Sequence, residues 1–344
     1  MLVFDAESDH LQTIIHGATA FELLRTAIEF DLFRLIEDNG GLDLAGVAGR
    51  LGVPEQPARV LLLGLASLRL LTKKGETYVN APVTKRSLLP TRPGYLGPLV
   101  EIQEKITNPG LRDFAESMRR DTNVGLRHLE GPGTTLYERV TVAPDLQQVF
   151  YNNMGHASRQ TFPLVARTFD FSKLRHVIDI GGGDGSNGIE LAKRYPELEV
   201  TVFDQESVLP IAKRNAVEAG VGDRFHGSPG DLFTDTLPTG ADGILFCHIF
   251  EIWSLERNTE LLAKCYDALP PGGCVLVYNF VSDNDNTGSV SAAFMSVYFL
   301  TVASGEGMVY SEQDMRASLT DAGFSRIESY EGVGYRHALL VGYK

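Results

Sequence analysis

Asp179-Ile180-Gly181-Gly182-Gly183-Asp184-Gly185 is the stretch that decides the fold, because it joins a short apolar run to a segment rich in Ala, Leu and Lys. The run HVIDI at 176–180 has the length and composition of a buried strand, and the segment that ends near Arg194 is typical of a helix. Glycines at such a junction let the backbone turn sharply and approach a ligand closely at the helix N-terminus. The sequence therefore predicts a strand, a turn and a helix, with a ligand site at the turn.

The alternation of strands and helices continues toward the C-terminus. LEVTVFD and ADGILFCHIF predict strands at 198–204 and 241–250, and a helix is expected between them from about Ser207 to Ala219. Short, continuously apolar strands that alternate with helices are typical of a parallel sheet covered on both faces. We expect an α/β, Rossmann-like doubly wound domain over 172–344.

The N-terminal part, over 1–100, predicts a mainly α-helical domain. Apolar residues recur at intervals of three and four over 21–36, which predicts one helix, and two shorter helices are expected at 43–51 and 54–68. LLTKKGETYVNAP, which follows, predicts a hairpin that turns at 74–76. Two helices and a hairpin in this order form a winged-helix outline.

Charge argues against the usual DNA-binding role of a winged helix. The net charge is −13, from 44 acidic and 31 basic residues, and Arg50 and Arg59 are the cations of 42–68. Such a balance disfavours nucleic acid and anionic membranes as partners. The acidic start MLVFDAESDH is unlike a secretory signal, and no apolar stretch reaches about 20 residues, so a cytoplasmic protein is expected. Breaks by Pro and Gly over 101–171 predict a helical linker or lid.

The glycine turn alone is compatible with a nicotinamide cofactor, a flavin or S-adenosylmethionine. The dinucleotide spacing G-x-G-x-x-G is only partly met, and an acidic, glycine-rich turn suits a sulfonium better than a pyrophosphate. Asp204 ends the second strand, about 20 residues after the glycines, where a carboxylate can accept hydrogen bonds from ribose hydroxyls. Gly230-Asp231-Leu232-Phe233 ends a third stretch, in which the Asp and the bulky residues after it can bind an adenine amino group and ring. S-adenosylmethionine is the favoured cofactor.

These motifs, together with LPPGG at 269–273, resemble the class I S-adenosylmethionine-dependent small-molecule O-methyltransferases of plants and bacteria. The resemblance covers the whole chain and implies a winged-helix dimerisation domain, a catalytic domain and a homodimer whose N-terminal helices interlock. The cofactor-binding residues that we expect on the motifs and on this resemblance are Asp179, Gly181, Gly183, Asp204, Gly230, Asp231, Leu232, Phe233, Cys247 and Trp253.

The catalytic segment departs from the family pattern. The family reads approximately Leu-His-Asp-Trp, with the histidine as general base, whereas this chain reads Cys247-His248-Ile249-Phe250-Glu251-Ile252-Trp253. Glu251 takes the histidine position, and a carboxylate in a dry pocket can act as a base. Glu251 is therefore the candidate base; the alternative is a solvated or capping carboxylate. His248 is its catalytic partner or a histidine satisfied by backbone groups; a metal site shared by His248 and Glu251 is a third, weaker alternative, because two ligands at this spacing are weak evidence. The cysteine spacings match no zinc pattern, and no metal is expected.

Residues that the family places around the substrate complete the predicted site: Phe150, Met154, Phe294, Met295, Tyr298 and Phe299. An apolar slot of this kind suits a planar ring, although such a stripe is also typical of plain core. GEGMVYS at 305–311 replaces a more basic family segment, so C-methylation is weighed equally with O-methylation. The expected function is methylation of a small phenolic or amino-acid-derived aromatic in secondary metabolism. A 2-keto acid C-methyltransferase and a non-methylating rearrangement enzyme are the alternatives.

Overall fold

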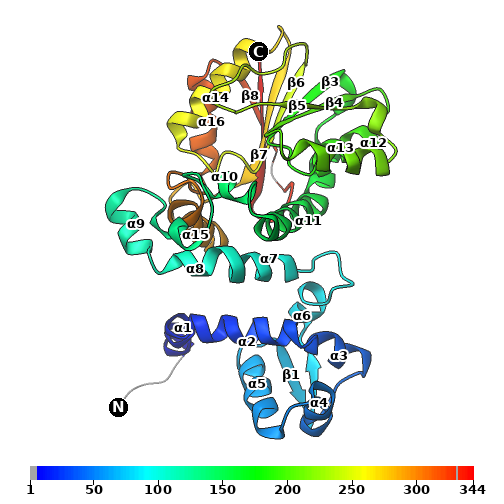
Figure 1. The fold of residues 1–344 in the computed structure, drawn as a ribbon, viewed down its shortest axis with the longest axis vertical. Coiled ribbons are helices and arrows are strands. Elements are labelled where there is room, and N and C mark those ends of the chain that lie inside the picture. The colour runs from blue at the N-terminus through cyan, green and yellow to red at the C-terminus, as the bar shows by residue number, and fades with distance from the viewer. Residues whose placement is uncertain (1–5, 331) are drawn as a thin grey trace. The chain divides into compact units, whose positions relative to one another are not determined.

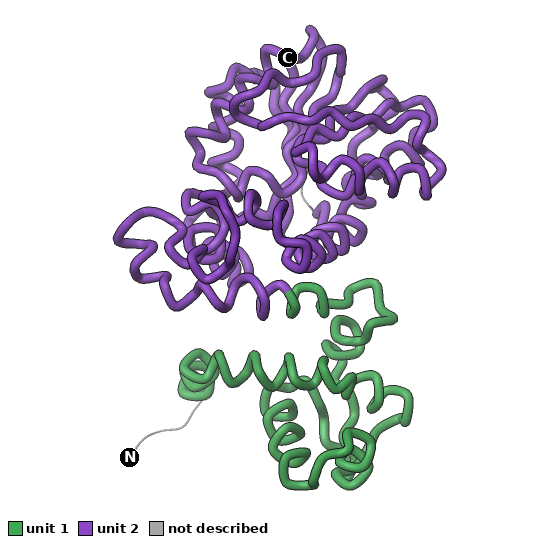
Figure 2. Tube along the Cα trace, viewed as in Figure 1, with its two compact units in different colours: residues 1–101 green, residues 102–344 purple. Residues whose placement is uncertain are grey.

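The computed structural model describes residues 6–330 and 332–344 of the chain (Figure 1). The chain forms two compact units, Met1–Glu101 and Ile102–Lys344 (Figure 2). Most of the segment that the sequence suggested as a linker or lid is therefore in the second unit. Its action as a lid, and the domain boundaries derived from the sequence, stay predictions.

The first unit is helical with one small hairpin. Asp43 caps the fourth helix by accepting a hydrogen bond from the Gly46 amide, and Gly52 ends it with a φ of 67°. Two helices followed by a hairpin have the order that the sequence predicted. The elements are α1 (Ala6–Ile15), α2 (Gly17–Glu29), α3 (Leu32–Asp38), α4 (Leu44–Leu51), α5 (Glu55–Ser67), β1 (Leu71–Lys74), β2 (Thr77–Asn80) and α6 (Pro82–Ser87), with α7 (Gly97–Ile102) at the junction of the units.

The single helix predicted over 21–36 is wrong, because the chain breaks between α2 and α3. Asp31 has a φ of 54°, a left-handed conformation that Asp tolerates better than most residues. Its carboxylate accepts a hydrogen bond from Arg34 at 2.5 Å. The break turns α3 onto the hairpin, where the Asn80 side chain donates to the Phe33 carbonyl at 2.7 Å. Hydrophobic periodicity does not reveal such a break, since both helices bury the same stripe.

The second unit begins with a run of short helices and one long helix. Pro144 occupies the first turn of the long helix, where its missing N–H costs no hydrogen bond. The elements are η1 (Gln103–Thr107, a π-helix), α8 (Asn108–Leu111), α9 (Phe114–Arg120), η2 (Val124–His128), α10 (Leu136–Val140), α11 (Pro144–Thr168) and η3 (Phe171–Lys173).

A seven-stranded sheet forms the core of the second unit, with the order β5-β4-β3-β6-β7-β9-β8. Neighbouring pairs from β5 to β7 are parallel, and β9 is antiparallel to both β7 and β8. The strands are β3 (His176–Ile180), β4 (Glu199–Asp204), β5 (Phe225–Pro229), β6 (Gly243–Cys247), β7 (Cys274–Phe280), β8 (Arg326–Tyr330) and β9 (His337–Tyr343). The doubly wound α/β prediction is confirmed.

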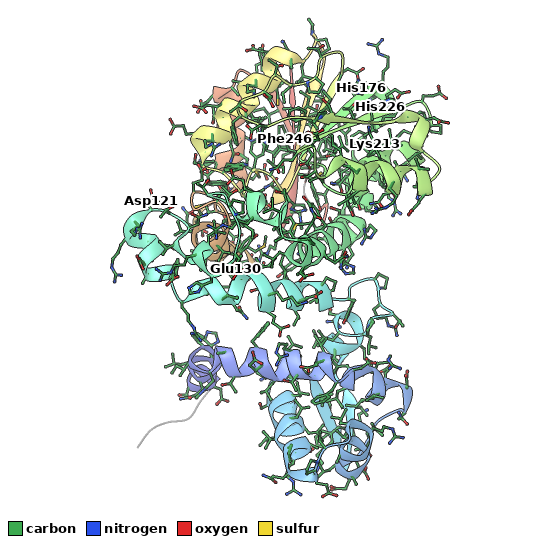
Figure 3. The ribbon with its side chains drawn as sticks, viewed as in Figure 1. Asp121, Glu130, His176, Lys213, His226 and Phe246 are labelled. Carbon is green, nitrogen blue, oxygen red and sulfur yellow. The ribbon has the colours of Figure 1, made fainter. Side chains whose placement is uncertain are left out.

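Helices cover both faces of this sheet (Figure 1). One face packs with α12 (Ser186–Arg194) and α13 (Leu209–Glu218), and the other with α14 (Leu255–Ala268) and α16 (Glu312–Asp321). Phe246, labelled in Figure 3, is fully buried on the α14 side. The remaining elements are η4 (Gly222–Arg224), α15 (Val290–Tyr298) and η5 (Phe299–Ala303, a π-helix).

The strand directions collect the predicted functional groups at one edge of the sheet. β3, β4 and β6 are parallel and end near Asp179, Asp204 and Cys247 respectively. β9 runs the other way, so that its first residue, His337, pairs with the last residue of β7, Phe280. Ligands of open α/β sheets bind at the carboxyl ends of the strands, which makes this edge the place to examine.

Candidate active site

The glycine turn after β3 has the geometry of a ligand cradle. Gly181 and Gly183 have φ values of 65° and 57°, which side chains other than glycine rarely adopt. A Cβ on Gly181 would lie 2.6 Å from the end of the Ile249 side chain, so a larger residue would have to displace that side chain as well as adopt a positive φ. The Gly183 amide donates to Asp204 Oδ2 at 2.9 Å, which fixes the turn against the end of β4.

Asp179 lies beneath this turn and is fully buried. Neither of its carboxylate oxygens has a hydrogen bond of ordinary geometry to a residue that the structure describes. Burial raises the pKa of Asp179 to about 8, with a smaller contribution from the charge of Asp204. Burial also raises the pKa of Asp204, although amides of Gly183 and Gln205 oppose the shift. Two adjacent buried carboxylates with raised pKa values favour a cationic ligand.

These residues fit S-adenosylmethionine. The sulfonium and the amino group of that cofactor carry positive charge, which would compensate Asp179 and Asp204. The absence of side chains at Gly181 and Gly183 leaves room beside the backbone, and among the residues that the structure describes neither oxygen of Asp179 has a hydrogen bond of ordinary geometry. A pyrophosphate would instead meet two carboxylates, Asp179 and Asp204, at the strand ends.

The segment predicted to hold adenine forms a tight turn after β5. Asp231 Oδ1 accepts hydrogen bonds from the amides of Phe233 and Thr234, both at 2.9 Å. Burial raises the pKa of Asp231, but these hydrogen bonds outweigh it and the net shift is downward. The Asp231 carboxylate is thus largely committed to the turn. Gly230 packs so closely that a Cβ would lie 2.4 Å from the Phe203 ring, and Leu232 is half-buried against the core.

Aromatic rings and one arginine lie next to this turn. Phe233 and Trp253 contact edge to face, with ring centroids 5.0 Å apart. The Arg257 guanidinium lies 3.7 Å from the Phe233 centroid and 4.4 Å from that of Trp253, in the range of cation–π contacts. Arg257 also donates to Glu306 at 2.6 Å. No pattern in the sequence marks Arg257, whose position depends on how α14 packs.

The candidate catalytic pair follows β6. His248 has a φ of 58°, an uncommon backbone conformation for a residue other than glycine. Its Nδ1 lies 3.2 Å from Glu251 Oε1, and only 2% of Glu251 is exposed. Glu251 Oε2 is buried without a hydrogen-bond partner among the residues described. Cys247 lies at the strand end, where burial raises the pKa of its thiol well above the usual range.

Aromatic side chains surround Glu251. Tyr137, a residue that the sequence did not single out, is half-buried, and its pKa is raised by desolvation, by Tyr298 and by the charge of Glu251. Burial raises the pKa of Tyr298 too, and Glu251 adds to the shift. Tyr137 contacts Phe150 edge to face at 5.9 Å and Trp253 at 6.3 Å. The arrangement is a wall of rings beside a carboxylate, which suits a planar aromatic molecule.

The remaining residues predicted to bind the substrate differ in how far they are buried. Met295 is half-buried against the core cluster that contains Phe250 and Ile252. Phe299 is buried, and Met154 packs with Phe150. Phe294, in contrast, is 71% exposed. It precedes Met295 by one residue, which is about 100° around the helix, and so lies on the exposed side of α15. The structure of this chain does not bring Phe294 to the other site residues, and its role in substrate binding stays a prediction.

Tyr151 is a second residue that the sequence did not single out. Burial raises its pKa, and the charges of Asp204 and Asp184 raise it further. A Cβ on Gly183 would lie 3.7 Å from the Tyr151 ring, which places this ring over the glycine turn. Tyr151 also meets Phe150 edge to face at 5.5 Å. It links the cofactor turn to the aromatic wall.

The segment 304–310 forms hydrogen bonds with the backbone of the catalytic segment. The Ser304 hydroxyl donates to the Ile252 carbonyl, and the Tyr310 hydroxyl donates to the Trp253 carbonyl at 3.0 Å. A Cβ on Gly307 would lie 2.2 Å from the Glu251 carbonyl oxygen, so the two backbones touch. This segment fixes the backbone that carries Glu251.

Within residues 6–330 and 332–344, no group of three or more His, Cys, Asp or Glu side chains has the arrangement of a metal site. In the same ranges, no helix has both the length and the apolar character needed to cross a membrane.

Comparison with known proteins identifies the family. A family model described as the O-methyltransferase domain matches residues 111–325, and the O-methyltransferase dimerisation domain matches residues 12–89. The chain belongs to the O-methyltransferase family. The predicted resemblance is confirmed, and the chain is an S-adenosylmethionine-dependent methyltransferase with a helical dimerisation domain ahead of its catalytic sheet.

Two curated relatives span almost the whole chain. One is an L-tyrosine C(3)-methyltransferase of Streptomyces lavendulae, 36% identical over 342 residues, which are 98% of this chain and 93% of the relative. Another is a 3-hydroxy-5-methyl-1-naphthoate 3-O-methyltransferase of Streptomyces sahachiroi, 32% identical over 93% of this chain and 90% of the relative. Among solved structures, the S-adenosylmethionine-dependent methyltransferase SibL matches with a TM-score of 0.83 and 35% identity, covering 97% of this chain and 98% of SibL.

Proposed function

We propose that this methyltransferase acts on a small phenolic ring and that Glu251 removes the phenolic proton. The observation that carries the proposal is the buried Glu251 carboxylate, whose Oε2 is without a partner among the described residues while Oε1 faces His248 at 3.2 Å. The rings of Tyr137, Tyr298 and Trp253 supply the wall that a planar substrate needs.

Each step of the reaction has a residue to serve it. Bound S-adenosylmethionine supplies an electrophilic methyl group. Asp179, the glycine turn and Asp204 hold the cofactor, and the aromatic wall orients the ring for in-line attack. Glu251 Oε2 accepts the phenolic proton, which leaves the electron pair on the oxygen and the ortho carbon available to form the new bond. After attack through carbon, the ring proton passes to water, which restores aromaticity as a phenolate, and the phenolate oxygen takes its proton back from Glu251.

Carbon is the first candidate for the methylated atom. The relative with 36% identity is named for methylation at a ring carbon of tyrosine, and the departures from the family pattern at Glu251 and at 305–311 support a changed geometry. Oxygen is the second candidate, because the relative with 32% identity is named as a 3-O-methyltransferase. Secondary metabolism is the proposed context, since both relatives come from Streptomyces.

The test is to incubate the protein with S-adenosylmethionine and a panel of tyrosine-like, kynurenine-like and hydroxynaphthoate-like compounds, with 2-keto acids alongside. S-adenosylhomocysteine release with a phenolic compound supports the proposal, and NMR of the product distinguishes a C-methyl from an O-methyl group. Release with the 2-keto acids alone would replace the phenolic proposal. Conversion of a compound without such release would indicate a rearrangement enzyme and overturn it.

We also propose that the protein is a cytoplasmic homodimer formed through the first unit. The winged-helix arrangement of this unit then serves dimer assembly and does not bind DNA. The dimerisation domain model covers residues 12–89. Leu11, Ile14 and Ile15 are 56%, 61% and 62% exposed, and their spacing places them along one side of α1. Sedimentation equilibrium should give twice the chain mass. Replacement of these three residues by Ser should weaken the dimer, and an unchanged dimer would exclude α1 from the interface.

A further inference from the structure

A second histidine, His337, lies beside the catalytic pair and belongs to none of the motifs. It is the first residue of β9 and is 6% exposed. Because β9 is antiparallel to β7 and pairs His337 with Phe280, the imidazole reaches the same sheet edge as the end of β6. Its ring centroid is 3.9 Å from that of Phe280 and 5.1 Å from that of His248.

The hydrogen bonding of His337 determines its tautomer. Nδ1 lies 2.7 Å from the backbone carbonyl oxygen of Tyr335. A carbonyl oxygen only accepts, so Nδ1 carries the hydrogen, and in the neutral ring Nε2 presents a lone pair. Burial and the nearby His248 lower the pKa of His337 to about 3, which keeps the ring neutral near pH 7.

Nε2 of His337 is a buried acceptor that lacks a donor among the described residues. Such a group is costly unless it is satisfied, and its nearest ring bearing an N–H is His248. Two imidazoles joined by an N–H···N bond have centroids about 5 Å apart. The observed 5.1 Å and the interplanar angle of 84° are compatible with that contact after a rotation of the His248 side chain.

We infer that His337 is a positioning residue for the methyl transfer reaction: its Nε2 accepts a hydrogen bond from Nε2–H of His248, while Nδ1–H of His248 donates to Glu251. The His248 ring then carries hydrogen on both nitrogens, because both of its partners are acceptors. The inference rests on the proposed role of Glu251. It accounts for the left-handed backbone of His248, which donates its own amide to the Tyr278 carbonyl at 2.9 Å and presents the ring to both neighbours. The groups that face His248 are Glu251 from its own segment, Tyr278 from β7 and His337 from β9.

Two substitutions separate the acceptor from the rest of the residue. His337→Asn keeps a donor for the Tyr335 carbonyl but has no atom at the Nε2 position. His337→Gln extends an amide oxygen toward that position. We expect kcat for His337→Asn to fall about ten-fold, the scale of one lost hydrogen bond, with S-adenosylmethionine affinity unchanged and His337→Gln within about three-fold of the natural protein.

His226→Asn is the matched control. His226 is paired with Glu199 at 2.8 Å and is about half exposed, and Figure 3 shows it near His176, away from the carboxyl ends of the strands. This substitution should change neither kcat nor cofactor affinity.

Nitrogen-15 NMR of histidine-labelled protein supplies a readout independent of turnover. We expect His337 as the Nδ1–H tautomer and a protected Nε2–H on His248, which loses its protection in His337→Asn. A His337 that carries hydrogen on Nε2, or a His248 signal unaffected by the substitution, would overturn the inference. Failure of the proposed phenolic activity alone would leave these spectra unchanged, so the two failures are distinguishable.

Discussion

Binding of S-adenosylmethionine should release a proton from Asp179. The pKa of this fully buried carboxyl group is about 8 in the ligand-free protein, because burial and the charge of Asp204 disfavour its ionised form. A cation beside it favours ionisation instead. At pH 7 a group with this pKa is about 90% protonated, so wild-type protein should release roughly 0.9 proton per cofactor more than Asp179→Asn.

The affinity should follow the same linkage. Through this group the dissociation constant should fall about nine-fold from pH 6 to pH 7 and about five-fold from pH 7 to pH 8, and the dependence should level off above pH 8. Asp179→Asn corrects for titration of the cofactor's own amino group, which is common to both proteins. Because Asp179 and Asp204 interact, the released proton belongs to the pair.

The pH dependence of the stability of the ligand-free protein is a second test of the raised pKa of Asp179. The folded-state pKa lies above the ordinary value of 3.8, so this group's contribution to the free energy of unfolding falls as the pH rises from about 4 to about 8. Asp179→Asn should lose that part of the pH dependence. Calorimetry at pH 7 in buffers of different ionisation enthalpy measures the proton count. Equal proton release by the two proteins, with parallel pH dependence of affinity, would refute this reasoning.

Two further substitutions test the cofactor cradle and the support of the catalytic segment. Asp204→Ala should weaken S-adenosylmethionine binding by about 1.5 to 3 kcal/mol, the scale of hydrogen bonds to a charged group. Replacement of the exposed Asp223 by Ala should leave this binding unchanged. An unchanged affinity of Asp204→Ala in calorimetry would contradict the assignment of Asp204 to the ribose hydroxyls. Gly307→Ala should lower the free energy of unfolding by about 1 to 3 kcal/mol, because its Cβ would lie 2.2 Å from the Glu251 carbonyl oxygen. Gly49→Ala is the control, since a Cβ there meets no atom within 4 Å. A thermal scan in which both variants match the natural protein would contradict the close approach at Gly307.

The order of elements around the glycine turn could be predicted because each depends on local sequence. Gly181 and Gly183 take the positive φ that the turn requires, and Gly52 ends its helix as expected. The break at Asp31 could not be predicted, since the apolar stripe continues through it. Phe294 shows the same limit in another form: a residue of the right type on the right helix still lies on the exposed side.

Residues contributed by tertiary pairing were beyond the sequence. His337 reaches His248 only because β9 pairs antiparallel with β7, and Tyr137 reaches Glu251 only through the packing of α10. Arg257 lies over Phe233 and Trp253 because α14 begins beside them. The pairs His337–His248, Tyr137–Glu251 and Arg257–Phe233 each join segments far apart in the chain, and no local pattern marks the residue.

Turnover of Glu251→Gln tests the central claim most directly. The amide keeps the size of the side chain but cannot take up a proton, so kcat with the accepted phenolic substrate should fall about 100-fold or more while S-adenosylmethionine affinity stays nearly the same. Glu256→Gln, an exposed position at the start of α14, should retain full activity. A Glu251→Gln protein that releases S-adenosylhomocysteine at the rate of the natural protein would contradict the assignment of Glu251 as the base.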